Sequence, residues 1–302
     1  MKKISLVIFL ALFAGNCLSA QVLLQTVTKR IEKSFPYKEG YEVNIEGEKA
    51  EVYVESWDRQ EIAVLVEITA KNPEKAVAER DLAAMQYDLT KVKAKIYLRN
   101  YLSGDEKDPK PESLFDVVYT VKLPEACPVY IKNYFGETEV KNLVNRLRIN
   151  SEFSKITLNN IRGVVGLDTR FGDLFGDYLD GQVNIFSRRS DLFLNHIRGS
   201  FDINAQYGAV RLFAEDDFLR LNVSADHSDV FFYHPNPQLL TYSLSSNQGK
   251  INTPSLLNAV MEADNPEFKK IHIKPSTGMA AAVTISVTFG DVTVEKARKP
   301  RP

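Results

Sequence analysis

An eighteen-residue period in the C-terminal half of the chain constrains its fold more than any other feature of the sequence. Segments beginning at Pro128, Arg146, Val164, Gln182 and Ser200 align without gaps. One apolar column contains Val129, Leu147, Val165, Val183, Phe201 and Leu219; a second contains Ile131, Ile149, Leu167, Ile185, Ile203 and Leu221. A small residue stands five positions after the second column, as Gly136, Ser154, Gly172, Ser190 and Gly208. Further apolar residues follow two and four positions later, such as Ile156 and Leu158.

Alternation of this kind predicts strands with one buried face, and the small residues allow the backbone to bend between them. A single unit cannot bury its apolar side alone, but stacked units align the columns into a continuous core. We therefore predict an all-β protein with a single-chain β-solenoid of about 18 residues per coil. An antiparallel meander is the alternative. The absence of a strict hexapeptide pattern favours a right-handed coil over a left-handed one.

The pattern continues less regularly after Gly208. The same rule fits around Ser228, Gly249 and Gly290, where the spacing lengthens and indicates small loop insertions. The 41 residues between Gly249 and Gly290 are enough for two coils, one of them an irregular rung through Ile271 and Ile273.

The remainder of the chain divides into two predicted parts. Residues 1–20 have two lysines, an apolar run and a small-residue cleavage site, which is the layout of a signal peptide. A lipoprotein anchored at Cys17 is the alternative. Residues 21–125 predict a β-rich module with a helix near 73–86, where Asn72 and Pro73 suit a helix start. The solenoid is then expected over 126–302, with the module capping its open end.

Composition excludes some classes of function. The formal net charge is −1, which argues against a nucleic-acid binder. No second transmembrane segment follows the signal peptide, and no phosphate loop, nucleophile elbow or metal-binding motif is found. We therefore expect no cofactor and no metal. Cys127 stands alone after signal cleavage and is expected to be a buried apolar residue rather than a nucleophile.

Several motifs resemble those of a known family. The stretch "VNIEGEKAEVYVESWDRQEIAVLV" precedes the predicted helix, and "FGETEV", "FSKITL", "FGDLFG" and "FGDVTV" recur after it. This arrangement resembles the bacterial putative-adhesin family, a domain of unknown function that is similar to auto-transporter adhesin heads and is common in exported Bacteroidetes proteins. The resemblance implies a β-solenoid and a location in the cell envelope. It supplies no catalytic residues.

Two outward columns are candidate sites. In a stack, residues eighteen apart lie about 4.8 Å from each other. Asp173 and Asp191 would form a pair of carboxylates near Arg170 and Arg188. Such a group could be the catalytic site of a carbohydrate-active lyase or glycosidase, or it could be a solvated charged surface without a catalytic role. The other column reads Phe175, Phe193, Arg211 and Phe231; a contiguous apolar patch of this kind marks a contact, unless the chain itself covers it.

The sequence thus predicts a non-catalytic, adhesin-like protein, periplasmic or on the cell surface, that presents a solenoid face to a glycan or to an envelope protein. The enzyme that uses Asp173 and Asp191 is the alternative. The oligomeric state stays open.

Overall fold

The computed structural model describes residues 23–102, 110–275 and 281–297, so the predicted signal peptide lies outside the described residues. This described part is nearly all β, with one α-helix and one short 3-10 helix, η1 (Pro237–Leu239). All its strands belong to one large sheet. The prediction of an all-β protein with one short helix is confirmed. None of the helices in the described part of the chain has the length and apolar character that crossing a membrane requires.

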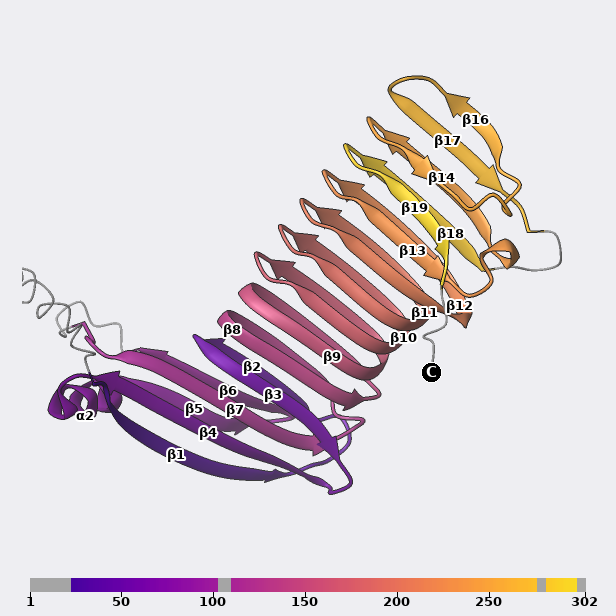
Figure 1. Ribbon diagram of the computed structural model, residues 1–302. Coiled ribbons are helices and arrows are strands. Elements are labelled where there is room, and N and C mark those ends of the chain that lie inside the picture. Colours follow the sequence, from indigo (N-terminus) through magenta and orange to yellow (C-terminus); the bar gives the residue numbers. More distant parts are fainter. Residues whose placement is uncertain (1–22, 103–109, 276–280, 298–302) are drawn as a thin grey trace, which may run out of the picture.

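The N-terminal strands form a broad sheet at one end of the molecule (Figure 1). The strand β4 (Glu61–Asn72) pairs antiparallel with β1 (Gln25–Pro36) and with β7 (Leu114–Pro124). The hairpin of β5 (Met85–Val92) and β6 (Lys95–Leu102) lies beside them. The helix α2 (Lys75–Ala84) falls within the predicted range and packs on β1 and β4.

One buried carboxylate fastens α2 to this sheet. Asp81 accepts backbone N–H groups of Glu112 and Ser113, each at 2.8 Å, and pairs with Arg80 at 2.7 Å. Burial by itself raises the pKa of Asp81, but the hydrogen bonds from Arg80 and Ser113 together lower it below the ordinary value. The carboxylate is therefore charged and fully partnered where the helix meets β7.

The N-terminal part continues directly into a stack of parallel strands. The strands β2 (Glu42–Glu48) and β3 (Ala50–Trp57) both pair in parallel with β8 (Val129–Leu143). Between them the backbone bends at Lys49, where φ is 51°. The apolar residues of β2 and β3 thus join the same core as the later strands.

From β8 to the first part of β12 (Val210–Asp226), neighbouring strands pair in parallel with partners eighteen residues apart. Val129 lies beside Leu147, and Leu174 lies beside Leu192. The strands involved are β8, β9 (Arg146–Arg170), β10 (Leu174–Arg188), β11 (Leu192–Gln206) and β12. We call each unit of two extended segments and the bend between them a rung. Figure 1 shows the rungs stacked side by side, away from the N-terminal sheet.

At the bend, the backbone of one rung comes close to the backbone of the preceding rung. A Cβ atom built on Gly172 would lie 2.1 Å from the carbonyl oxygen of Ser154 in the preceding rung, so no larger residue fits there. Segments before the bend form a first face of the stack, and segments after it form a second face. Inward side chains from both faces make one buried core, including Leu147, Ile149, Ile156 and Leu158.

The prediction that Leu219 continues the first apolar column is wrong. Register shifts between β11 and β12 place Phe201 beside Leu221 and Ile203 beside Val223. Leu219 is 63% exposed. The rung before Leu221 is therefore two residues longer than the others. As a result, Leu221 and Val223 occupy the two buried columns.

The expected two coils between Gly249 and Gly290 are not found. Instead β18 (Ala282–Thr288) lies between β12 and β14 (Thr241–Asn247), paired in parallel with both. In the same way β19 (Val292–Lys296) lies between β13 (Val230–His234) and β15 (Ile251–Asn252). The rung of Gly290 therefore inserts between the rungs of Ser228 and Gly249.

The far end of the stack is an antiparallel hairpin. The strand β17 (Phe268–Ile273) runs antiparallel to β14, and β16 (Val260–Asp264) pairs antiparallel with β17. Ile271 and Ile273 are buried in β17, but they belong to this antiparallel hairpin and not to the irregular rung that the sequence predicts.

Candidate functional site

The predicted column of Phe175, Phe193, Arg211 and Phe231 lies on the second face in consecutive rungs. Phe175 is directly beside Phe193, Phe193 beside Arg211, and Arg211 beside Phe231. The period-two alternation of the strands points these side chains outward, because their neighbours Leu174, Leu192, Val210 and Val230 fill the core.

These rings are not covered by the described part of the chain. Phe175 and Phe193 are 40% and 39% exposed, and their ring centroids lie 6.5 Å apart. Two cations border the rings: the Arg211 guanidinium lies 5.4 Å from the Phe231 ring, and the Lys155 ammonium lies 5.5 Å from the Phe175 ring. The surface is thus aromatic with a cationic margin.

A second aromatic column, absent from the prediction, widens this surface. Phe213 stands two residues after Arg211 and packs against Phe193 at 5.3 Å and against Tyr233 at 4.4 Å. Burial and the nearby Glu295 raise the pKa of Tyr233, so its phenol stays neutral. The alternation of the strands puts residues two apart on one face, so the sequence contained this information. We call Phe175, Phe193, Phe213, Phe231 and Tyr233 the aromatic strip.

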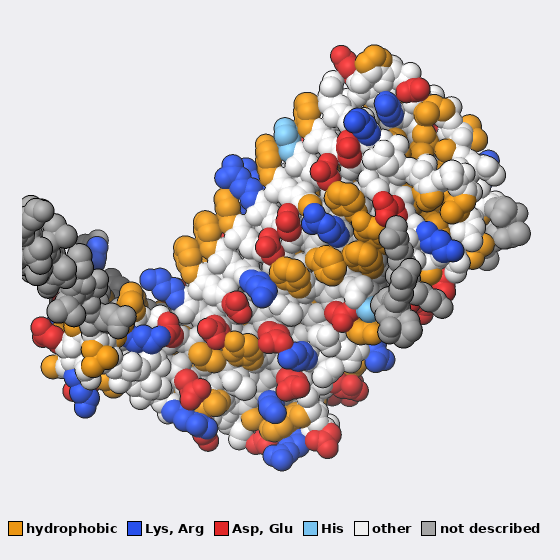
Figure 2. All heavy atoms as spheres, viewed as in Figure 1, with side chains coloured by type: hydrophobic (Ala, Val, Ile, Leu, Met, Phe, Trp, Pro, Cys, Tyr) orange, Lys and Arg blue, Asp and Glu red, His pale blue; other side chains and the backbone are white. Residues whose placement is uncertain are grey.

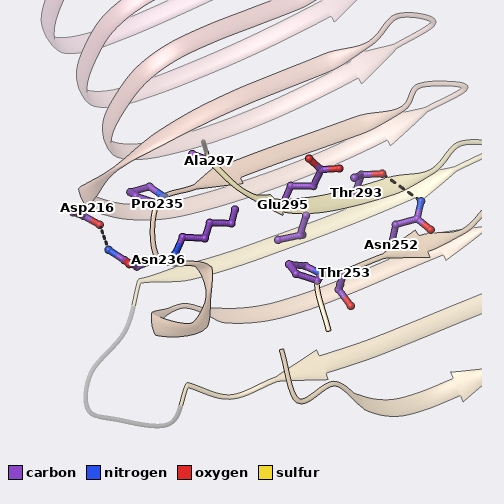
Figure 3. A pocket seen from close by; sticks show the side chains of 11 residues that line it. Asp216, Pro235, Asn236, Asn252, Thr253, Thr293, Glu295 and Ala297 are labelled. Carbon is purple, nitrogen blue, oxygen red and sulfur yellow. Dashed lines mark hydrogen bonds between the residues drawn. The ribbon is translucent and has the colours of Figure 1, made fainter. Parts of the chain in front are cut away.

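A cavity lies beside the end of the aromatic strip. It has a volume of about 870 Å³ and is lined by Asp216 of β12, by residues of β15 and β19, and by the segment at Asn236 that precedes η1. Thr293, which pairs with Phe231 in the ladder, accepts a hydrogen bond from Asn252 at 3.3 Å (Figure 3). Asn236 donates to Asp216 at 2.9 Å across its rim. Sequence reasoning missed this cavity because the inserted strand β19 builds it.

The acidic column has structural partners. Asp173 accepts the backbone N–H of Asp191 at 3.0 Å, and Asp191 accepts the N–H of Ala209 at 2.8 Å. Asp229 does the same for Asp291 at 2.9 Å. Each carboxylate therefore fastens its rung to the next, in the way that Asp commonly satisfies backbone groups at turns.

The predicted arginines are stacked, but Arg170 pairs with carboxylates outside the acidic column. Arg170 and Arg188 are ladder neighbours, as expected. Arg170 pairs with Glu152 at 3.6 Å and with Asp168 at 3.4 Å, both outside the acidic column. Asp191 reaches only Arg211, at 4.0 Å. Asp173, Asp191 and Arg170 thus have structural partners, and the described residues include no group of three His, Cys, Asp or Glu residues that could hold a metal ion.

A row of stacked side chains lines the bend between the two faces, and sequence reasoning missed it too. Its members all have positive φ between 49° and 58° and are Phe135, Phe153, Phe171, Arg189, Tyr207, His227 and Phe289. Phe153 lies 4.9 Å from Phe135 and 4.8 Å from Phe171, with nearly parallel rings. Figure 2 shows this row as hydrophobic side chains along one long edge, interrupted by a basic residue and a histidine. We call it the edge ladder.

The edge ladder ties neighbouring rungs together. Bulky residues rarely adopt left-handed backbone geometry, at a cost of about 1 kcal/mol or more each, and stacking of about 0.5–1.5 kcal/mol per pair offsets that cost. Its sequence signature is an aromatic residue or a histidine directly before the small residue in most units, as in "FGET" and "FGDV", with Arg189 as the exception within the row.

Cys127 is buried, and burial raises the pKa of its thiol to about 12. We expect iodoacetamide near neutral pH to alkylate Cys127 in the native protein more slowly than in denaturant by about a thousandfold, because so little thiolate is present. Mass spectrometry of the peptide that carries Cys127 measures the rate. Comparable rates in both conditions would contradict a buried, unreactive thiol.

No family model and no curated protein matches the chain. Three solved structures are similar over most of their length. A putative adhesin from Bacteroides fragilis is 10% identical, with 88% of this chain and 97% of that one covered and a TM-score of 0.44. A putative adhesin from Parabacteroides merdae is 11% identical, with coverages of 90% and 96% and a TM-score of 0.40. A putative cell adhesion protein from Clostridium sporogenes is 12% identical, with coverages of 90% and 100% and a TM-score of 0.26.

Proposed function

We infer that the chain is an exported, adhesin-like β-solenoid of the cell envelope that binds a partner, a glycan or a protein, through the aromatic strip. It acts without catalysis, in the periplasm or on the cell surface. The predicted signal peptide supports export, and the eighteen-residue ladder spacing supports the solenoid. A right-handed coil is part of this proposal.

One observation carries the binding role: aromatic side chains in four consecutive rungs, Phe175 and Phe193 most of all, keep part of their surface open to solvent on one face. Contiguous apolar patches of several hundred Å² are unusual on the surfaces of soluble monomers and mark contact sites. Aromatic residues and arginine also supply most of the binding energy in protein interfaces, and Arg211 lies between Phe193 and Phe231 of the strip. A rigid stack of strands holds these rings in place before a partner arrives, which lowers the entropic cost of binding.

The enzyme alternative has no comparable support. Asp173 and Asp191 are engaged with backbone N–H groups of the next rung, and Arg170 is engaged with Glu152 and Asp168. A general acid and base need access to the atoms of a substrate, whereas these groups have partners that the fold itself requires.

We expect the double substitution Phe175→Ser/Phe193→Ser to abolish partner binding while the protein stays folded. Both rings are partly exposed, so their loss removes contact area for a partner at little cost to the core. Purified protein would be applied to a glycan array, and beads coated with it would be tested for adherence to bacterial cells. A loss of about 2 kcal/mol per hot-spot ring lowers affinity by more than about tenfold.

The matched control is Phe135→Ser/Phe153→Ser, which removes two rings that are at least as exposed from the edge ladder instead. This control variant should still bind the partner, provided that binding is measured below the melting temperature of the variant. The strip variant should lose at least one interaction that this control keeps. Absence of binding in both assays, or a strip variant that retains every interaction of the unsubstituted protein in full, would refute the proposed role of the strip.

A further inference from the structure

The first face carries a groove that lies on the opposite side of the core from the aromatic strip. It has a volume of about 670 Å³ and crosses six neighbouring rungs, from Arg148 to Thr284. Its floor is the backbone and the buried side chains Leu167, Ile185 and Ile203. Two columns of outward side chains border it, and nothing in the proposed function uses them.

The groove owes part of its depth to a glycine that the fold does not need. A Cβ atom added to Gly166 would meet nothing nearer than the Cγ atom of Arg148 at 4.0 Å, and the backbone of Gly166 has no positive φ. Gly172, by contrast, is fixed by the backbone of the preceding rung. The absence of a side chain at Gly166 leaves the groove deeper between Arg148 and Asn184, and it has no role in the packing of the backbone.

The walls present groups that both donate and accept hydrogen bonds. Four rungs contribute the carboxamides of Asn150, Asn184, Asn204 and Asn222, while Ser224, Thr284 and Ser286 add hydroxyls at one end. Asn184 and Asn204 are exposed and take part in none of the side-chain hydrogen bonds found among the described residues. Amide groups without protein partners are available to a polar ligand. The partly buried ring of Phe186 supplies an apolar platform between them.

The carboxylates of the groove are paired locally, and the arginine that lines it, Arg148, lies over the ring of Tyr130 at 5.8 Å. Asp168 pairs with Arg170 at 3.4 Å, and Asp202 pairs with Arg220 at 3.1 Å while accepting a hydrogen bond from Asn222 at 2.6 Å. A polyanion would approach these carboxylates at a cost, and a polycation would compete with arginines already in place. The lining therefore fits a neutral ligand rich in hydroxyl groups.

The spacing of the rungs identifies the form of that ligand. Neighbouring strands lie about 4.8 Å apart, so six rungs span about 24 Å. An extended polysaccharide advances by a similar distance for each sugar, so a chain laid along the stack would meet one amide, hydroxyl or carboxylate at each unit. Phe186 would pack against the apolar face of one pyranose ring, as aromatic platforms do in polar sites.

We propose that this groove binds a neutral polysaccharide chain that runs along the axis of the stack. The groove is separate from the aromatic strip, so the two sites work independently. It gives the protein a fixed specificity for uncharged glycans whatever partner the strip binds.

Isothermal titration calorimetry on the purified protein tests this. The probes are hexasaccharides of β-1,4-linked glucose, mannose and xylose and of β-1,3-linked glucose, with hexagalacturonate and hexaglucosamine as charged comparators. At least one neutral hexasaccharide should bind at least about tenfold more tightly than either charged one. Tighter binding of a charged comparator, or no binding of any neutral probe, would overturn the proposal.

Gly166→Val and Phe186→Ser locate the site. Gly166→Val raises the floor of the groove at a position where an added Cβ atom has open space, and it should weaken neutral binding at least about tenfold while the melting temperature is kept. Phe186→Ser should weaken it similarly. The strip variant Phe175→Ser/Phe193→Ser should bind the hexasaccharide as the unsubstituted protein does. Neutral binding that survives Gly166→Val, or that only the strip variant loses, would overturn the assignment to the groove and leave the role of the strip to its own test.

Discussion

Gly172→Ala should lower the free energy of unfolding by about 3 kcal/mol, although it adds a single methyl group. The new Cβ atom would lie 2.1 Å from the carbonyl oxygen of Ser154 and 2.6 Å from its carbonyl carbon. Both are backbone atoms of the neighbouring rung, so no side-chain rotation can relieve the overlap. The two rungs must separate at the bend, and the ladder hydrogen bonds beside it must lengthen.

Gly166→Ala is the matched control, in the same strand stack and only six positions earlier. Its Cβ atom has open space, and alanine restricts the unfolded chain more than glycine does. We expect its stability to stay within about 0.5 kcal/mol of the unsubstituted protein, or to rise slightly. Denaturant midpoints and hydrogen exchange of the amides near residue 172 measure the difference. Equal stability of the two variants would contradict the close approach of the rungs.

The eighteen-residue columns are sufficient to predict the register of β8 to β11. Residues such as Val129, Leu147 and Val183 are buried because a strand has a fixed period of two, and this period survives in the sequence. The outward column of Phe175, Phe193 and Arg211 follows from the same register. These features depend only on local alternation and on a constant rung length.

The failures occur where the rung length changes. A bulge before Leu221 shifts the register, whereas Leu219 is equally suitable by pattern because it is apolar and one period away from Phe201. The positions around Gly249 and Gly290 obey one rule, so either could follow Ser228 in the stack. Their order depends on connections and long-range pairing, which leave no periodic pattern.

The edge ladder escapes prediction for a different reason. Left-handed backbone positions normally predict glycine or asparagine, whereas Phe135, Phe153 and Phe171 occupy them here. Their stacking across rungs compensates for the strain, and that compensation exists only in the assembled stack. A rule based on local propensity therefore assigns the left-handed position to the small residue and not to the phenylalanine directly before it.

The inserted rung makes the C-terminal third of the stack depend on the last strands of the chain. Ile285 is fully buried and lies between Val223 of β12 and Leu244 of β14. We expect Ile285→Asp to cost more than about 4 kcal/mol, because it places an unpaired carboxylate in the core. With β18 displaced, β14 loses its parallel neighbour, so the amides of both β14 and β18 should lose protection in hydrogen exchange.

Ile271→Asp provides the contrast, since Ile271 is also buried but belongs to the antiparallel hairpin at the end of the stack. It should open β16 and β17 while β18 remains protected by β12 and β14. If the rungs were stacked in chain order instead, β14 would pair directly with β12. Ile285→Asp would then open only the terminal strands β18 and β19, and β14 would stay protected. Hydrogen-exchange protection of β14 after Ile285→Asp thus decides between an inserted and a sequential last rung. Only in the inserted arrangement does β18 lie between β12 and β14, so only there does β14 lose protection when β18 is displaced.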